Sequence, residues 1–67
     1  MCQARVYFCR NSGEGERLVM EDVALVEIEG EVCILCSLFG EQQRIRGRIT
    51  RIDLLRHAIY VEEEGNV

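Results

Sequence analysis

The chain alternates apolar and polar positions in short runs, which is typical of β-strands with one buried face. In residues 2–9, Ala4, Val6 and Phe8 share one face, and Cys2 has the same parity. Similar runs predict further strands at residues 17–20, 23–29, 32–39, 42–53 and 58–61. Polar residues and glycines separate these runs, so the pattern predicts an all-β fold joined by turns.

The later strands indicate how the sheet closes. Residues 32–39 are almost entirely apolar, so we expect a central strand that is buried on both faces. In residues 42–53 the alternation slips once, and Gly47 or the residues just after it are suited to a β-bulge or a sharp bend. The count is six or seven short strands at regular spacing, joined by turns. This spacing predicts a small antiparallel barrel or roll, SH3-like.

Residues 1–67 are expected to form a single domain, with the acid-rich residues 62–67 as a frayed tail. A domain this small buries only about 60% of its unfolded surface, so disulfides, a metal or oligomerisation usually add stability. The N-terminus lacks the basic and apolar regions of a signal peptide, and no apolar stretch is long enough to span a membrane. We therefore expect a cytoplasmic protein, in which four cysteines indicate metal binding, redox chemistry or packing.

Cys2 is the candidate metal ligand. A backbone amine, a backbone amide and a thiolate within two residues can chelate one ion in five-membered rings. If Met1 is removed, the Cys2 amine and sulfur still form a bidentate pair. Such donors suit square-planar nickel(II) or copper(II). The alternative is that Cys2 is a small apolar residue at the start of a strand.

The pair Cys33 and Cys36 matches the C-x-x-C spacing of zinc sites, but its context favours packing. Residues three apart on a strand point to opposite faces, so the two sulfurs should diverge. A second pair would have to come from Cys2 and Cys9, which also fall on opposite faces. A structural zinc site with all four cysteines stays open as an alternative, and it predicts that a chelator unfolds the chain.

A basic stripe offers a second possible function. Arg44, Arg46 and Arg48 alternate within one predicted strand, so they share one face. The alternative protein is therefore a small SH3-like or Sm-like barrel that binds RNA or a protein partner through this face. Acidic residues are ready cross-strand partners for the stripe: Glu27, Glu29 and Glu31. The net charge of −4 also means that the chain lacks the excess of positive charge that is usual in proteins that bind nucleic acids. We therefore do not expect a nucleic-acid partner.

Catalysis has little support in the sequence. There is one histidine, His57, which falls in a predicted turn and is more often a surface residue there than a ligand. Tyr7 and Tyr60 are few and far apart in the chain, which argues against a stacking platform. A Gly-rich phosphate loop and a nucleophile turn are missing, so we expect a protein that is not an enzyme.

The ordered set of motifs resembles the CooT family, small accessory proteins of carbon monoxide dehydrogenase maturation. The residues that carry this resemblance run from Met1-Cys2, Ala4 and Val6 through Met20-Glu21-Asp22-Val23 and Leu38-Phe39-Gly40-Glu41 to Gly47-Arg48-Ile49, Ile52-Asp53-Leu54, His57 and Ile59. The resemblance implies a homodimeric β-protein that binds Ni(II) through Cys2 at or near the dimer interface. It also implies a nickel enzyme, carbon monoxide dehydrogenase, as the client.

Overall fold

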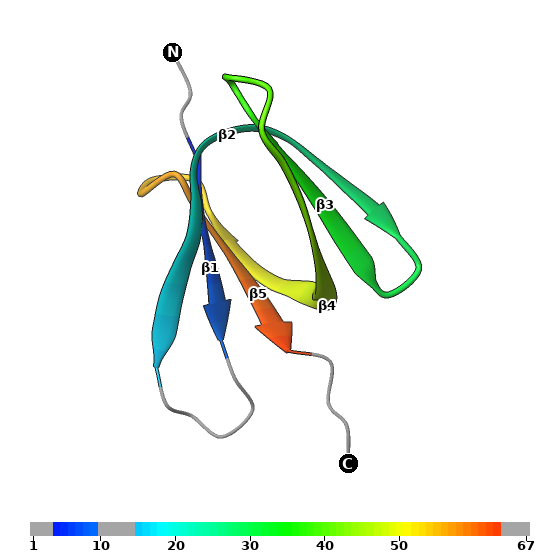
Figure 1. The fold of residues 1–67 in the computed structure, drawn as a ribbon. Helices are drawn as coiled ribbons and strands as arrows, with labels where there is room; N and C mark the ends of the chain where they lie inside the picture. Colours follow the sequence, from blue (N-terminus) through cyan, green and yellow to red (C-terminus); the bar gives the residue numbers. More distant parts are fainter. Residues whose placement is uncertain (1–3, 10–14, 64–67) are drawn as a thin grey trace.

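The computed structural model describes residues 4–9 and 15–63, which form five strands. The strands are β1 (Ala4–Cys9), β2 (Glu16–Glu29), β3 (Val32–Ser37), β4 (Gln42–Asp53) and β5 (Ala58–Glu63). They close into a barrel in the order β1-β2-β3-β4-β5 (Figure 1). Neighbouring strands are antiparallel except at the closure, where β1 runs parallel to β5. The prediction of a small all-β barrel is confirmed.

The strand count is five because predicted strands merge. Residues 17–20 and 23–29 belong to one strand, β2, which pairs with β1 in its first half and with β3 in its second half. The chain bends between the halves at Asp22, whose φ of 54° is in the left-handed region. Aspartate tolerates this conformation better than most residues. The polar pair Glu21-Asp22 therefore bends the strand and does not end it.

The predicted irregularity in β4 is present. The pairing of β4 with β5 shifts register between Ile49 and Arg51, just after Gly47. Gly47 itself is buried, and a Cβ at this position would lie 2.6 Å from the carbonyl oxygen of Glu62. The glycine therefore lets β4 pass close to β5, and the bulge that follows turns the strand across the barrel.

The ends of two strands differ from the sequence pattern. β3 ends at Ser37, and Phe39 lies in the following turn with 78% of its surface exposed. β5 continues through Glu62 and Glu63, which the charge pattern placed in the tail, while residues 64–67 lie outside the described residues.

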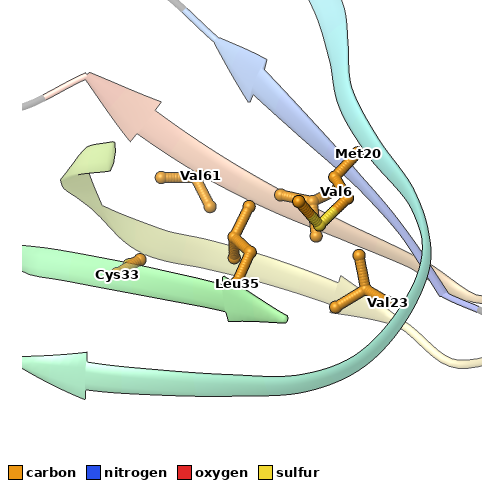
Figure 2. Packing of buried hydrophobic residues seen from close by; sticks show 6 residues of the cluster. All are labelled: Val6, Met20, Val23, Cys33, Leu35 and Val61. Atoms are coloured by element: carbon orange, nitrogen blue, oxygen red, sulfur yellow. The ribbon is translucent and has the colours of Figure 1, made fainter. Parts of the chain in front are cut away.

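The core lies inside the barrel and draws on four strands. Figure 2 shows its buried side chains, which are Val6, Met20, Val23, Cys33, Leu35 and Val61. Ala4 and Phe8 pack against this cluster, so the predicted inward face of β1 is confirmed. Within the described residues, the structure has no helix with the length and apolar character needed to cross a membrane.

Candidate metal site

Cys2, the predicted metal ligand, lies outside the described residues, so the structure defines the site from Ala4 onward. The start of β1 is fixed by backbone contacts on both sides. Ala4 pairs with Val23 of β2, and the Arg5 amide donates to the carbonyl oxygen of His57 at 2.9 Å. The described part of β1 therefore begins at a defined point between β2 and the β4–β5 turn.

The turn between β3 and β4 lies on one side of this point. The Leu38 amide donates to the carbonyl oxygen of Asp22 at 2.8 Å, which joins the turn to the bend in β2. The hydroxyl of buried Ser37 accepts hydrogen bonds from the amides of Phe39 and Glu41, both at 3.1 Å. These contacts hold the turn in shape without covering its apolar side chains.

The turn between β4 and β5 lies on the other side. The Asp53 carboxylate accepts a hydrogen bond from the Arg56 amide at 3.2 Å, which closes the turn. His57 ends it with a φ of 55°, in the left-handed region. A cavity of about 130 Å³ opens between this turn and the start of β1, with Ala4, Asp53 and His57 among its lining residues.

Exposed apolar side chains gather on these two turns and beside them. They are Leu38 (46% exposed), Phe39 (78%), Ile52 (53%), Leu54 (79%) and Leu55 (89%), and we refer to them as the apolar rim. Figure 1 shows both turns at the end of the barrel where β1 begins. Because scattered exposed apolar residues are common but gathered ones mark interaction surfaces, this end of the barrel is suited to contact another protein.

The cysteines of β3 point in different directions, as the C-x-x-C analysis predicted. Cys33 is fully buried in the core, and its thiol lies 3.5 Å from the Gly47 carbonyl oxygen as a hydrogen-bond donor. Burial raises the pKa of the Cys33 thiol. Cys36 is half-buried on the other face of β3, where its sulfur accepts a hydrogen bond from the Gln42 side chain at 3.6 Å. The surroundings of both thiols are therefore those of cysteines that pack within the chain.

Cys9 lies on the outer surface of the barrel between two acids. Its register partners are Glu16 on β2 and Glu62 on β5. Burial raises the pKa of the Cys9 thiol, and the two carboxylates raise it further, while Arg51 lowers it. Among the residues that the structure describes, no three His, Cys, Asp or Glu side chains converge on a point that can hold a metal ion.

The basic stripe is exposed but is interspersed with acids. Its residues lie on β4 and are Arg44, Arg46 and Arg48. Arg46 forms an exposed ion pair with Glu31 at 3.5 Å, and Arg48 is the register partner of Glu62. The expected pairing with Glu27 and Glu29 is wrong, because β3 separates their strand from β4. The result is a face of mixed charge.

The two tyrosines are neighbours, contrary to the expectation that they are scattered. Parallel pairing of β1 with β5 places Tyr7 beside Tyr60, and their rings stack with centroids 5.5 Å apart. The guanidinium of Arg51 lies 4.3 Å from the centroid of the Tyr60 ring. The sequence could not reveal this stack because it depends on the closure of the barrel. Sequence reasoning also missed the apolar rim, although the pair Leu54-Leu55 in a predicted turn was a signal for it.

Comparison with known proteins gives consistent results. The family model described as "CO dehydrogenase accessory protein CooT" matches residues 1–62. An uncharacterized protein of Methanocaldococcus jannaschii is 42% identical over 62 residues, which cover 92% of this chain and 98% of the relative. A second, from Methanothermobacter thermautotrophicus, is 36% identical over 64 residues, with coverage of 96% and 92%. A crystal structure assigned to CooT from Carboxydothermus hydrogenoformans superposes with a TM-score of 0.82 at 30% identity, with coverage of 96% and 100%.

Proposed function

The chain belongs to the CooT family of CO dehydrogenase accessory proteins, and from this we propose that it binds nickel(II) through Cys2 at a homodimer interface. In this proposal the bound nickel is cargo, which the protein supplies for insertion into carbon monoxide dehydrogenase. The observation that carries the proposal is the apolar rim. Its turns are tied by backbone hydrogen bonds to Arg5 and to the bend in β2, close in the chain to Cys2, so we expect a second copy that covers the rim to lie near the metal.

Covalent geometry keeps Cys2 close to this surface. Two peptide units separate it from Ala4, and consecutive Cα atoms are 3.80 Å apart, so the two Cα atoms are at most about 7.6 Å apart. Ala4 itself is fixed by its pairing with Val23. A thiolate on so short a tether stays near the rim wherever it points.

One thiolate cannot satisfy a four-coordinate nickel ion, and this is the reason for a dimer. A twofold interface places the same patch of both subunits face to face, so two Cys2 thiolates can meet near the axis. Two sulfurs and two nitrogen donors then complete one planar site per dimer. The interface also buries apolar surface, which a domain of 67 residues needs for stability.

The donor chemistry sets the pH dependence and the selectivity. Free thiols have a pKa of about 8.5, so they are mostly protonated at neutral pH and must lose protons to bind metal. Nickel affinity should therefore rise with pH. The affinity of the site for divalent metal ions should follow their usual order, with copper(II) above nickel(II) and nickel(II) above cobalt(II). Nickel delivery would then depend on metal supply and on handover to the client enzyme.

The test is the nickel content of the purified dimer beside its Cys2→Ser variant. We expect about one nickel per two chains in the wild type and stoichiometric binding to be lost in Cys2→Ser, with an unchanged circular dichroism spectrum. Cys36→Ser is the matched control, because Cys36 is half-buried on β3 and should keep full nickel binding. Equal nickel content in the wild type and Cys2→Ser would refute the assignment of Cys2.

A further inference from the structure

We propose that the two turns of the apolar rim bind each other across the dimer, with the Phe39 ring of each copy entering the cavity beside the β4–β5 turn of the other. This inference rests on the homodimer of the proposed function, but it does not depend on the nickel ligands. It assigns the cavity as the binding site for an aromatic side chain of a second copy.

The cavity has the size and the lining that a phenyl ring requires. Its volume is about 130 Å³, and an apolar cavity of about 150 Å³ is large enough to hold benzene. Five of its seven lining residues are apolar: Ala4, Ile52, Leu54, Ala58 and Ile59. Since Ile52 and Leu54 are 53% and 79% exposed, the cavity is open to a side chain from a partner.

Phe39 is presented to a partner on a turn of fixed shape. Phe8 packs against the core, whereas 78% of the surface of Phe39 is exposed. The amides of Phe39 and Glu41 donate to the Ser37 hydroxyl at 3.1 Å, and the Gly40 amide donates to the Ser37 carbonyl oxygen at 3.2 Å. Because the turn is already ordered, burial of the ring costs little further backbone entropy. Phenylalanine is also among the residues that are enriched in interfaces.

The charges near the two turns favour contact between unlike turns. Two exposed arginines, Arg5 and Arg56, and one acid, Asp53, lie on the side of the cavity. Three acids lie around the β3–β4 turn, and they are Glu21, Asp22 and Glu41. A β3–β4 turn that docks on the cavity therefore brings opposite charges together, whereas two β3–β4 turns in contact would repel each other.

The arrangement on one end of the barrel makes a second copy the matching partner. Figure 1 shows both turns at the end where β1 begins, so each copy offers both a ring and a cavity on one surface. A twofold interface is self-complementary, and each contact in it forms twice. Two copies then fill both cavities and cover both exposed rings, which closes the assembly at a dimer.

The first test uses the whole chain labelled with 4-fluorophenylalanine, because its two phenylalanines give two ¹⁹F signals. We expect the Phe39 signal to shift between dilute and concentrated samples, as monomers become dimers. In the dimer this signal should lose its sensitivity to replacement of H₂O by D₂O, because the ring is shielded from solvent. The Phe8 signal is the internal control and should stay constant, since its ring packs against the core.

Two variants remove opposite halves of the contact. Phe39→Ala removes the ring, and Leu54→Glu places a carboxylate at the cavity; both side chains are largely exposed, so both barrels should fold. In sedimentation velocity, each variant alone should raise the Kd of the homodimer at least ~100-fold, because the contact is lost twice. Ile28→Ala, at an exposed apolar residue of β2 outside the rim, is the matched control and should dimerise as the wild type does.

A mixture of the two variants tests the pairing itself. The Leu54→Glu chain keeps its ring and the Phe39→Ala chain keeps its cavity, so the mixed dimer has one intact contact. We therefore expect the mixture to dimerise at least ~10-fold more tightly than either variant alone. If both variants are monomers and their mixture is no tighter, the ring and the cavity do not bind each other, and the inference is wrong.

The remaining outcomes separate this inference from the proposed function. If the wild type dimerises while Phe39→Ala dimerises equally well, or while the Phe39 signal still responds to D₂O, the inference fails and the proposed function stands. If the wild type is monomeric at every concentration, with and without nickel, the homodimer of the proposed function fails together with the inference.

Discussion

Replacing Cys33 by alanine separates the two possible roles of the C-x-x-C pair, packing and metal binding. The Cys33 side chain is fully buried and belongs to the same cluster as Leu35 and Val61. Removing its sulfur deletes one large heavy atom from the core. Comparable one-atom deletions, such as isoleucine to valine, cost about 0.5–1.5 kcal/mol through lost transfer energy and the cavity left behind.

We therefore expect the Cys33→Ala variant to be destabilised by about 0.5–1.5 kcal/mol. The long S–H···O contact with Gly47, at 3.5 Å, adds little to this estimate. A domain of this length has a stability of about 3–10 kcal/mol, so the variant should fold. Its melting temperature should fall by about 2–12 °C. Urea unfolding followed by circular dichroism measures the change, and nickel content should stay at the wild-type level.

The same variant has a predictable pH dependence. Burial raises the pKa of the Cys33 thiol above that of an exposed thiol, so at high pH the folded chain keeps a proton that the unfolded chain loses. This contribution to stability is fully present below the pKa of an exposed thiol, about 8.5, and is lost as the pH rises through the folded pKa. The alanine variant lacks it, so its stability deficit should narrow above pH 9.

Two results would contradict this reasoning about Cys33. Loss of nickel binding in a folded Cys33→Ala variant would make the C-x-x-C pair a metal site. A deficit that stays constant from pH 7 to pH 10 would show that the thiol is not shielded from water. Cys36→Ala is the control, since its half-buried sulfur should cost less than about 1 kcal/mol.

Two further predictions test the barrel and its rim. Gly47→Ala should destabilise the chain by about 1–3 kcal/mol, because the new Cβ would lie 2.6 Å from the Glu62 carbonyl oxygen. Urea unfolding measures the change, and an unchanged midpoint would show that β4 can move away from β5 at little cost. The double variant Leu54→Ser/Leu55→Ser should stay folded, since these side chains are 79% and 89% exposed, but should shift the proposed dimer towards monomer in sedimentation velocity. Ile28→Ser, an exposed apolar residue of β2 outside the rim, is its control, and an equal effect from this change would contradict the role of the rim.

The local features of the fold could be predicted from the sequence because they depend on neighbouring residues. Alternation placed Val6 on the inner face of β1, and the turn at Gly30-Glu31 joins β2 to β3 between the strands predicted at residues 23–29 and 32–39. The slip in the pattern after Gly47 marked the real change of register in β4. Each of these depends on a period of two residues or on the turn preference of glycine.

Features that depend on distant pairing could not be predicted. The continuity of β2 through Asp22 requires β1 and β3 to pair with its two halves. The parallel pairing of β1 with β5 is fixed when the barrel closes, and the contact of Tyr7 with Tyr60 follows from it. For the candidate site, the assignment of Cys2 as a metal ligand stays a prediction from the sequence. The exposure of the apolar rim could not be predicted, because the exposure of a turn depends on what folds over it.

The hydrogen bonds around the start of β1 allow the proposed metal binding to be tested separately from folding. The backbone holds this point: Ala4 pairs with Val23, and the Arg5 amide donates to the carbonyl oxygen of His57. The side chains of His57 and of the rim are left exposed by these contacts. Because backbone atoms fix the geometry, substitutions of exposed side chains can remove a ligand or an interface while the barrel stays intact. If the chain binds nickel as proposed, a loss of nickel in such variants can therefore be assigned to the changed side chain and not to unfolding.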